Sequence, residues 1–328
     1  MFNKMIAQQT AKKEKLLDNF LKKHEAEYPF PEDVELICDI DYMGDGKPCH
    51  FMDIYRPRNY EGKLPVMFNL HGGGFLFGKK EEGHLFCAEM SQRGFLVFSF
   101  EYPLAPEALF PQILKDLMTG MGNAKRYFET YDGDGEHIYM TGTSAGASLC
   151  VYLAAMLKSP ELAKAFQVVP NDLKIRALGL ASGMYYTTKP DSIGIFLPSY
   201  IYGKHWKKSS FYPYINPENK EIIRNLPPSF LVTAYGDTFR NYSRQYAKAI
   251  KKAGVICHLE DYEVDKKLPH AFSTTFPEME ESKRANTQMV EFLLNTDEMP
   301  GNLTGVRIRI ILPAQGCNRY IQLRTQFS

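Results

Sequence analysis

The chain has 328 residues, of which 44% are hydrophobic, enough to bury one large core, or one core with a lid. Lys and Arg total 39 against 38 Asp and Glu, and the net charge of +1 gives no electrostatic reason to expect nucleic acid or an anionic membrane as a partner. The N-terminus lacks the apolar core of a secretory signal, and no stretch approaches the roughly 18 apolar residues of a membrane span. We therefore expect a cytoplasmic protein.

The first 28 residues predict a weakly amphipathic helix, which Pro29 and Pro31 end. Two β-rich runs at 34–42 and 51–55 follow, and the Gly-Asp-Gly turn between them favours an antiparallel pair. Further on, short apolar runs alternate with helical stretches, which is typical of buried parallel strands. The runs lie at 66–70, 96–100, 138–141, 177–181, 230–234 and 257–262, and the helices at 84–93, 112–129, 145–158, 240–253 and 277–295. This alternation predicts a doubly wound α/β sheet with right-handed crossovers.

The longest interruption of this alternation covers about residues 184–226 and is rich in aromatic side chains. A connection of that length inside a compact domain is usually functional, so we interpret it as a lid. A helical insertion that packs its own small core is the alternative, and the two interpretations are compatible. Beyond it, the tail at 300–328 has four arginines and no acidic residue. We treat this tail as an appendage: a disordered segment, an added edge strand or a read-through product.

A nucleophile motif is present at 142–146, where Gly-Thr-Ser-Ala-Gly fits the pattern G-x-S-x-G. It follows a strand and precedes a helix, and such a turn lifts the hydroxyl of Ser144 above the sheet edge. The N-terminus of that helix also favours developing negative charge. The alternative, a glycine-bounded turn with an incidental serine, is disfavoured by this context. Acyl transfer by an activated serine is therefore the leading hypothesis.

A second glycine motif, His-Gly-Gly-Gly-Phe at 71–75, follows the strand at 66–70. Consecutive glycines allow backbone conformations that direct several N–H groups at one point. We expect the N–H groups of Gly73, Gly74 and Ala145 to bind an oxyanion. A phosphate-binding loop is the alternative, but its usual glycine patterns are absent from the sequence.

A serine nucleophile needs a base and a group that orients it, in the chain order Ser, Asp or Glu, His. Asp237 comes directly after the strand at 230–234, and His270 lies between the last strand and the last helix. Asp261 and Asp265 compete for the acidic role, and Asp237 could instead be a turn cap. We predict Ser144, Asp237 and His270 as the catalytic residues.

Two remaining sets of side chains suggest no other chemistry. The histidines have no spacing typical of metal ligands, so no metal site is expected. The cysteines are scattered without paired spacing, which indicates reduced thiols. They are Cys38, Cys49, Cys87, Cys150, Cys257 and Cys317.

These motifs resemble those of the hormone-sensitive lipase-like carboxylesterases, and the likeness spans about residues 30–296. Between the two glycine motifs, the stretch Glu-Tyr-Pro-Leu-Ala-Pro-Glu at 101–107 is similar to the family's Y-R-L-A-P-E. The chain has Pro103 where the family usually has Arg, Ala271 where Gly usually follows the histidine, and D-T-F-R-N in place of D-P-L-R-D.

The resemblance implies an eight-stranded, mostly parallel α/β-hydrolase sheet flanked by helices, no cofactor, and the triad named above. It also implies a cap built from the N-terminal helix, residues 1–30, and the insertion at about 184–226 of a hydrolase domain at 31–299. We expect a serine carboxylesterase that acts on short-chain acyl esters, with a homodimer as the candidate assembly. The expected substrate contacts are Phe75, Tyr185, Phe196 and Tyr200.

Other functions remain open at this point. One is an acetyl or feruloyl esterase that acts on plant polysaccharide esters. Another is an acyl-peptide hydrolase, although the chain has no room for a propeller domain before residue 71. A third is a non-catalytic small-molecule receptor on a hydrolase scaffold, which would usually lack a member of the triad, whereas Ser144 and His270 are both present.

Overall fold

The computed structural model describes residues 2–263 and 268–298, so the predicted tail at 300–328 lies outside the described residues. The strands of this part are β1 (Val34–Asp41), β2 (Phe51–Pro57), β3 (Leu64–Leu70), β4 (Leu96–Phe100), β5 (Gly133–Thr143), β6 (Ile175–Ala181), β7 (Ser229–Ala234) and β8 (Cys257–Tyr262). The α-helices are α1 (Phe2–Glu27), α2 (His84–Gln92), α3 (Phe110–Ala124), α4 (Ala145–Met156), α5 (Pro160–Ala165), α6 (Ser192–Phe196), α7 (Pro198–Ile201), α8 (Lys220–Ile223), α9 (Arg240–Lys252), α10 (Phe272–Thr275) and α11 (Glu280–Leu294). Short 3-10 turns are η1 (Pro48–His50), η2 (Lys80–Gly83), η3 (Lys125–Tyr127), η4 (Trp206–Lys208), η5 (Tyr212–Tyr214) and η6 (Asn295–Glu298).

The strands form one eight-stranded sheet in the order β1-β2-β4-β3-β5-β6-β7-β8. The opening strands pair in antiparallel fashion, β1 with β2 and β2 with β4, and every later pair is parallel. In the centre of the sheet, Val66 of β3 pairs with Leu96 of β4 and with Ile138 of β5. The predicted α/β-hydrolase sheet is thereby confirmed.

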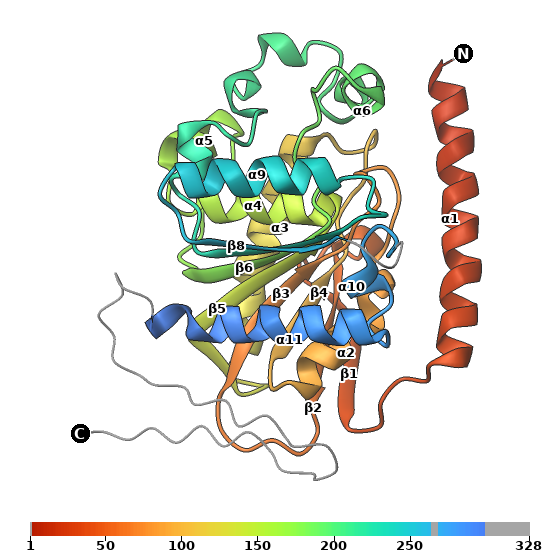
Figure 1. Cartoon of the computed structure of the whole chain (residues 1–328), viewed down its shortest axis with the longest axis vertical. Helices are drawn as coiled ribbons and strands as arrows, with labels where there is room; N and C mark the ends of the chain where they lie inside the picture. Colours follow the sequence, from red (N-terminus) through yellow and green to blue (C-terminus); the bar gives the residue numbers. More distant parts are fainter. Residues whose placement is uncertain (1, 264–267, 299–328) are drawn as a thin grey trace.

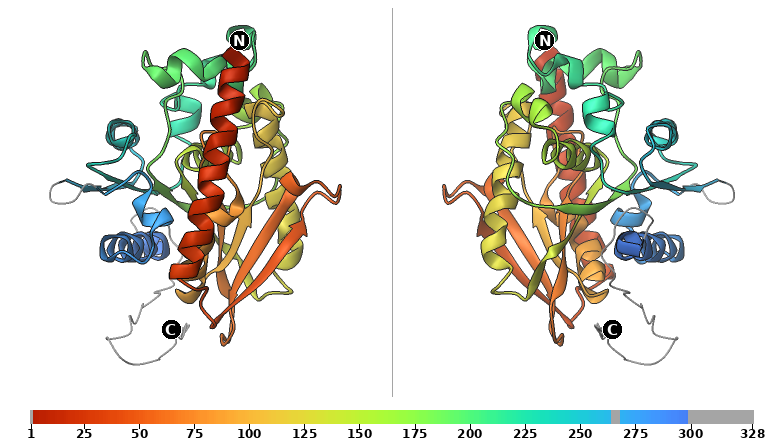
Figure 2. Two further views of the ribbon diagram at one scale, coloured as in Figure 1. Left: turned by 90° about the vertical axis from the view of Figure 1, so that its right-hand side faces the viewer. Right: turned by 90° about the vertical axis from the view of Figure 1, so that its left-hand side faces the viewer.

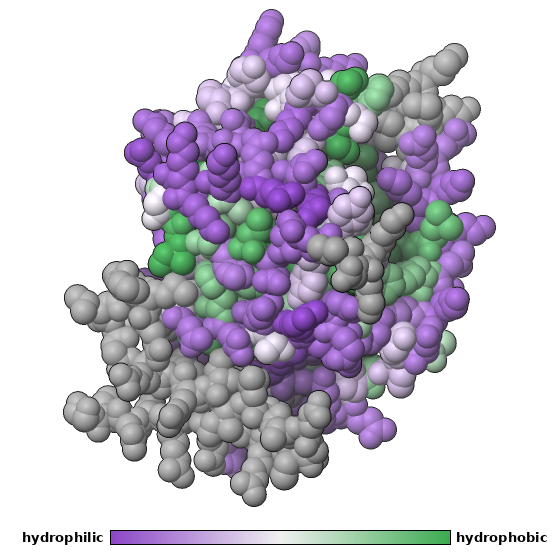
Figure 3. Space-filling view, in the orientation of Figure 1, coloured by the Kyte–Doolittle hydropathy of each residue, from purple (hydrophilic) through white to green (hydrophobic). Residues whose placement is uncertain are grey.

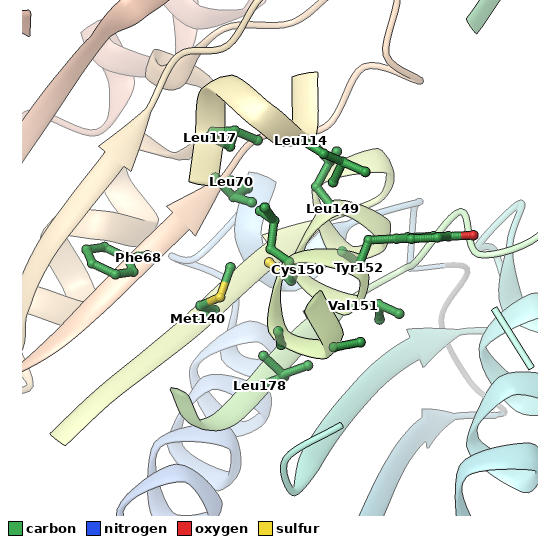
Figure 4. Close-up of a cluster of buried hydrophobic side chains, with 14 of the residues drawn as sticks. Phe68, Leu70, Leu114, Leu117, Met140, Leu149, Cys150, Val151, Tyr152 and Leu178 are labelled. Carbon is green, nitrogen blue, oxygen red and sulfur yellow. The ribbon is translucent and has the colours of Figure 1, made fainter. Parts of the chain in front are cut away.

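Apolar side chains alternate between the two faces of the sheet and give each face its own core. Along β3, Val66, Phe68 and Leu70 belong to one core and Met67 to the other. The first core lies under α3, α4 and α9, and the second lies under α2 and α11 (Figure 1). Figure 4 shows the first core where side chains of α3 and α4 meet those of the central strands. Because helices cover both faces, the parallel strands are buried, and their carboxyl ends are the edge at which loops gather.

Two segments lie beside this edge. The helix α1 runs along the side of the molecule on which α10 lies (Figure 1) and crosses in front of the body toward the segment between β6 and β7 (Figure 2). Of its described side chains, Leu21 is buried, and Leu16 is 58% exposed. In the second segment, α6 carries the exposed side chains Ile195 and Phe196. Figure 3 shows hydrophobic residues gathered over α6 on an otherwise mostly hydrophilic face.

Candidate active site

Ser144 occupies the sharp turn between β5 and α4. Its backbone has φ 54° and ψ −110°, a strained conformation for a residue other than glycine, which is the hallmark of a nucleophile elbow. Small neighbours make the turn possible. A methyl group at Gly142 would lie 2.5 Å from the Gly146 carbonyl, and one at Gly146 would lie 2.1 Å from the Leu70 carbonyl oxygen. The turn is fixed further by the Ser144 N–H, which donates to the Ala181 carbonyl at 2.8 Å.

The glycine loop after β3 packs directly against this elbow. A methyl group on Gly72 would lie only 3.4 Å from the Cβ atom of Ser144. The next two residues, Gly73 and Gly74, have φ values of 95° and 63°, which side chains disfavour. Within the described part of the chain, the N–H groups of Gly73, Gly74 and Ala145 donate to no protein acceptor. Space in front of Gly74 is open, because a methyl group there would meet nothing within 4 Å.

A buried pair of side chains, His71 and Glu101, stabilises the glycine loop. The Nε2 atom of His71 lies 2.9 Å from the Glu101 carboxylate, and its Nδ1 atom lies 3.0 Å from the Gly72 carbonyl oxygen. Burial lowers the pKa of His71, but the Glu101 carboxylate more than offsets this and leaves the pKa above its ordinary value. Tyr102 stacks on the imidazole at 4.1 Å, and its hydroxyl donates to the carbonyls of His71 and Gly72 at 2.8 and 3.1 Å. These contacts fix the backbone from which the N–H groups project.

Lys80 connects this pair to β2, the strand next to the sheet's edge. Its N–H donates to the second oxygen of Glu101 at 3.1 Å, and its buried ammonium group lies 2.9 Å from Asp53 of β2. Sequence reasoning missed the roles of Lys80 and Asp53, which carry no motif. The only available signal for Glu101 was its place in the 101–107 stretch.

Asp237 and His270 meet beyond the ends of β7 and β8. The Nδ1 atom of His270 lies 2.6 Å from Oδ1 of Asp237, whose side chain is fully buried. The same carboxylate accepts from the Thr233 hydroxyl at 2.6 Å and from the Phe239 N–H at 2.9 Å. Burial is the largest single influence and raises the pKa of Asp237, but the hydrogen bond and charge of His270, together with the hydrogen bonds from Thr233 and Phe239, leave the pKa below its ordinary value. An ionised carboxylate fixed in this way holds the Nδ1–H tautomer and leaves Nε2 free to accept a proton.

The loop that carries His270 adjoins the elbow that carries Ser144. The Ala271 N–H donates to the hydroxyl of Ser182 at 3.0 Å, next to the residue that accepts from the Ser144 N–H. Thr143 and Thr274 also share a hydrogen bond of 3.0 Å. Among the described residues, no hydrogen bond joins the Ser144 hydroxyl to His270 itself. Such bonds are often long in free enzymes and tighten when substrate binds.

The competing residues have other partners. Asp261 pairs with Arg240 at 2.7 Å and with Arg244 at 3.3 Å, which leaves it no contact with His270. Asp265 lies outside the described residues. His258 of the edge strand β8 stacks on Phe230 with ring centres 5.0 Å apart, and its Nε2 atom lies 3.3 Å from Glu260.

The four expected substrate contacts lie in different surroundings. Phe75 is fully buried against Phe110 at a ring distance of 5.3 Å, and Tyr185 is 2% exposed and packs on Tyr246 at 4.4 Å. Phe196 is 51% exposed on α6, and Tyr200 of α7 is half-buried. Accessible surface is therefore present at Phe196 and Tyr200 and nearly absent at Phe75 and Tyr185. The substrate-binding role of all four residues stays a prediction.

Residues 2–263 and 268–298 also have features that concern metal binding, membranes and disulfides. No three His, Cys, Asp or Glu side chains in these ranges are arranged to hold a metal ion. No helix there has both the length and the apolar character needed to cross a membrane. The five cysteines in these ranges are unpaired, and Cys317 lies outside them.

Comparison with known proteins agrees with this geometry. Residues 67–274 match a family profile described as having the α/β-hydrolase fold. This match covers more than half of the chain, so the chain belongs to the α/β-hydrolase family. The resemblance to hormone-sensitive lipase-like carboxylesterases is confirmed, and a solved esterase of the bacterial hormone-sensitive lipase family has a TM-score of 0.66 at 19% identity, over 88% of this chain and 91% of that one.

Individual relatives are esterases. The chain is 27% identical over 230 residues to a probable isoprenylcysteine alpha-carbonyl methylesterase of Arabidopsis thaliana. The aligned region covers 66% of this chain but only 48% of that protein. The chain is 25% identical over 245 residues to the versiconal hemiacetal acetate esterase of Dothistroma septosporum, which covers 70% and 73% of the two chains. In structure it is similar to esterase B of Lactobacillus rhamnosis, with a TM-score of 0.83, 20% identity, and coverage of 90% and 96%. At that identity, the structural likeness concerns the fold.

Proposed function

We propose that this protein is a serine carboxylesterase that hydrolyses short-chain acyl esters through an acyl-enzyme on Ser144. One observation carries the proposal: a strained serine turn packs against a loop whose N–H groups have no protein acceptor among the described residues. An imidazole already paired with a buried carboxylate lies on the adjoining loop. Nucleophile, base and oxyanion donors are the three parts that acyl transfer requires.

The mechanism follows from these parts. The Nε2 atom of His270 takes the Ser144 proton as the hydroxyl oxygen attacks the ester carbonyl, while Asp237 stabilises the imidazolium that forms. The N–H groups of Gly73, Gly74 and Ala145 bind the negative oxygen of the tetrahedral intermediate. The imidazolium then protonates the departing alcohol. Water, activated by the same imidazole, attacks the acyl-enzyme and releases the carboxylic acid.

The preference for small acyl groups rests on aromatic packing beside the glycine loop. Phe110 contacts Phe75 of the loop at 5.3 Å and Tyr202 of the insertion at 5.4 Å, and Tyr202 contacts Trp206 at 6.0 Å. Because these rings fill the space beside the glycine loop, we expect them to limit the acyl group to about four carbons or fewer, or to a flat aromatic group. The name of the Dothistroma relative, an acetate esterase, supports a small acyl group.

We propose further that α1 and residues 184–226 form a cap over a hydrolase domain at 31–299. The cap helix contacts the segment that follows the glycine loop: Asp18 lies 2.7 Å from Lys79, and the Lys13 ammonium group lies 5.0 Å from the centre of the Phe77 ring. Both contacts support the proposal that α1 belongs to the cap. Homodimer formation stays a prediction.

The test is a panel of p-nitrophenyl esters graded by acyl length, assayed with wild type, Ser144→Ala and Ser91→Ala. Ser91 is a matched control, because its buried hydroxyl on α2 has no hydrogen-bond partner in the described structure. We expect Ser144→Ala to lower kcat by about 10⁴–10⁶-fold, and Ser91→Ala to leave it nearly unchanged. Retention of most acetate turnover by Ser144→Ala would refute the serine mechanism, and rates that climb steadily to long chains would refute the preference.

A further inference from the structure

A continuous set of contacts joins the catalytic imidazole to the segment between β6 and β7. The Phe239 ring stands perpendicular to the His270 imidazole, with ring centres 5.2 Å apart and an angle of 85°. The Phe239 N–H also donates to Asp237 at 2.9 Å, and its side chain is 9% exposed. Phe239 therefore contacts His270 through its ring and Asp237 through its backbone N–H.

Tyr242 continues this set one turn further along α9. Its ring stacks on Phe239 at 5.2 Å with an angle of 19°, and its hydroxyl donates to the Asp191 carboxylate. Asp191 is the N-cap of α6, where it accepts from the N–H groups of Ile193 and Gly194 at 3.0 and 3.1 Å. The Asp191 carboxylate therefore binds both the first N–H groups of α6 and the hydroxyl of Tyr242, whose ring stacks on Phe239.

Lys189, just before α6, also contacts the aromatic rings at this point. The ammonium group of Lys189 lies 4.1 Å from the Tyr186 ring and 4.7 Å from the Tyr242 ring. Tyr186 in turn meets Tyr242 edge to face at 5.3 Å. The backbone just before α6 is therefore packed against α9, so a displacement of α6 requires Tyr242 to move or its contacts to break.

We propose that Phe239 is a positioning residue that couples α6, through Asp191 and Tyr242, to the alignment of His270 with Ser144. This coupling rests on the proposed esterase function. Asp237 constrains one edge of the imidazole and Phe239 constrains its orientation, yet no hydrogen bond to Ser144 is formed in the described structure. A substrate that contacts the exposed side chains of α6, Ile195 and Phe196, shifts this stack and completes the alignment.

Another part of the same segment is anchored elsewhere, which supplies a matched control. The Tyr152 hydroxyl of α4 donates to the carbonyls of Tyr214 and Ile215, both at 2.8 Å. The Tyr214 hydroxyl itself donates to Glu161 of α5 at 2.7 Å. Tyr214→Phe and Tyr242→Phe each remove one hydrogen bond that joins a tyrosine hydroxyl to a carboxylate and ties this segment to the rest of the protein. Only the bond of Tyr242 belongs to the set of contacts that reaches His270.

The experiment compares kcat and KM for p-nitrophenyl butyrate in wild type, Tyr242→Phe, Phe239→Leu and Tyr214→Phe. We expect Tyr242→Phe and Phe239→Leu to lower kcat about tenfold with KM changed less than about twofold, since small misplacements of a catalytic group cost up to about 10²-fold. Tyr214→Phe should leave kcat within about twofold of wild type, a change of no more than about 0.4 kcal/mol in activation free energy. Equal effects of the two Tyr→Phe variants would overturn the coupling.

A second readout separates the coupling from the esterase function. The proton between His270 and Asp237 gives a low-field ¹H resonance, which Asp237→Asn identifies by removing it. We expect this resonance to shift in Tyr242→Phe and to stay in place in Tyr214→Phe. If wild type hydrolyses no ester but the resonance shifts as expected, the esterase function fails and the contact path stands. If wild type is active and the resonance does not respond to Tyr242→Phe, the coupling fails and the esterase function stands.

Discussion

At the scale of single residues, two aspartates near β7 and β8 have opposite surroundings, and Asp237 is the one in contact with His270, the proposed base. Asp237 has a buried carboxylate 2.6 Å from His270, whereas Asp261 is neutralised by Arg240 and Arg244. Asp237→Asn is expected to lower kcat about 10³–10⁴-fold, because the wrong imidazole tautomer becomes favoured. Asp261→Asn should lower it less than about tenfold. Steady-state assays of the two variants test the assignment, and the reverse ranking would move the acid of the triad.

The His71–Glu101 pair makes a prediction about pH at the same scale. The pKa of His71 is raised by Glu101, and that of Glu101, despite burial, is lowered by His71. The pair therefore stabilises the fold above the ordinary pKa of Glu101 and below that of His71. This contribution is lost as pH rises through the raised pKa of His71, and also as pH falls through the lowered pKa of Glu101.

Glu101→Gln removes the pair and leaves a buried imidazole without its partner. We expect the free energy of unfolding at about pH 6 to fall by roughly 3 kcal/mol, and the difference from wild type to shrink as pH rises. Urea unfolding at several pH values measures both effects. Glu280→Gln, at a side chain 85% exposed on α11, is the control that should change neither. A difference that grows toward alkaline pH would contradict the account.

At the scale of elements, the elbow depends on how closely β5 and α4 approach β3. Gly146→Ala would place a methyl group 2.1 Å from the Leu70 carbonyl oxygen, so the helix must shift and carry Ser144 with it. We expect a loss of about 1–3 kcal/mol in the free energy of unfolding and a large loss of kcat. Gly135→Ala in β5 is the control, because its methyl group would meet Phe128 at an ordinary 3.5 Å. Thermal unfolding and ester turnover compare the two, and equal effects would contradict the close-approach argument.

Strands that appear in the sequence as short apolar runs could be predicted, and β4 and β8 have the predicted bounds. The prediction missed the start of β5, because Gly133 and Asp134 are typical of a turn but here pair with Leu64 and Pro65 of β3. The proposed triad residues could be singled out because each follows a recognisable strand, and their catalytic roles stay a prediction. Glu101 could not be paired with His71, because 30 residues separate them and only the parallel pairing of β3 and β4 brings them together.

At the scale of the whole molecule, the proposed cap draws on two segments that are far apart in the sequence, and α1 runs along the body toward the end at which the segment between β6 and β7 lies (Figures 1 and 2). Of the α1 side chains whose burial is described, only Leu21 is buried, at 8% exposed. We therefore expect deletion of residues 1–28 to leave cooperative unfolding in place and to relax the limit on acyl length. Thermal unfolding and the graded ester panel check both expectations. Loss of the folded state would show instead that α1 is part of the core.

The central claim is that Ser144 is the nucleophile, and covalent labelling tests it most directly. A fluorophosphonate that reacts with activated serines is applied to wild type and to His270→Ala, and the modified peptide is located by mass spectrometry. We predict one label on the peptide that carries Ser144 in wild type, and at least about 10³-fold slower labelling in His270→Ala because the base is gone. An active wild-type protein that carries the label on another residue, or no label at all, would contradict the account.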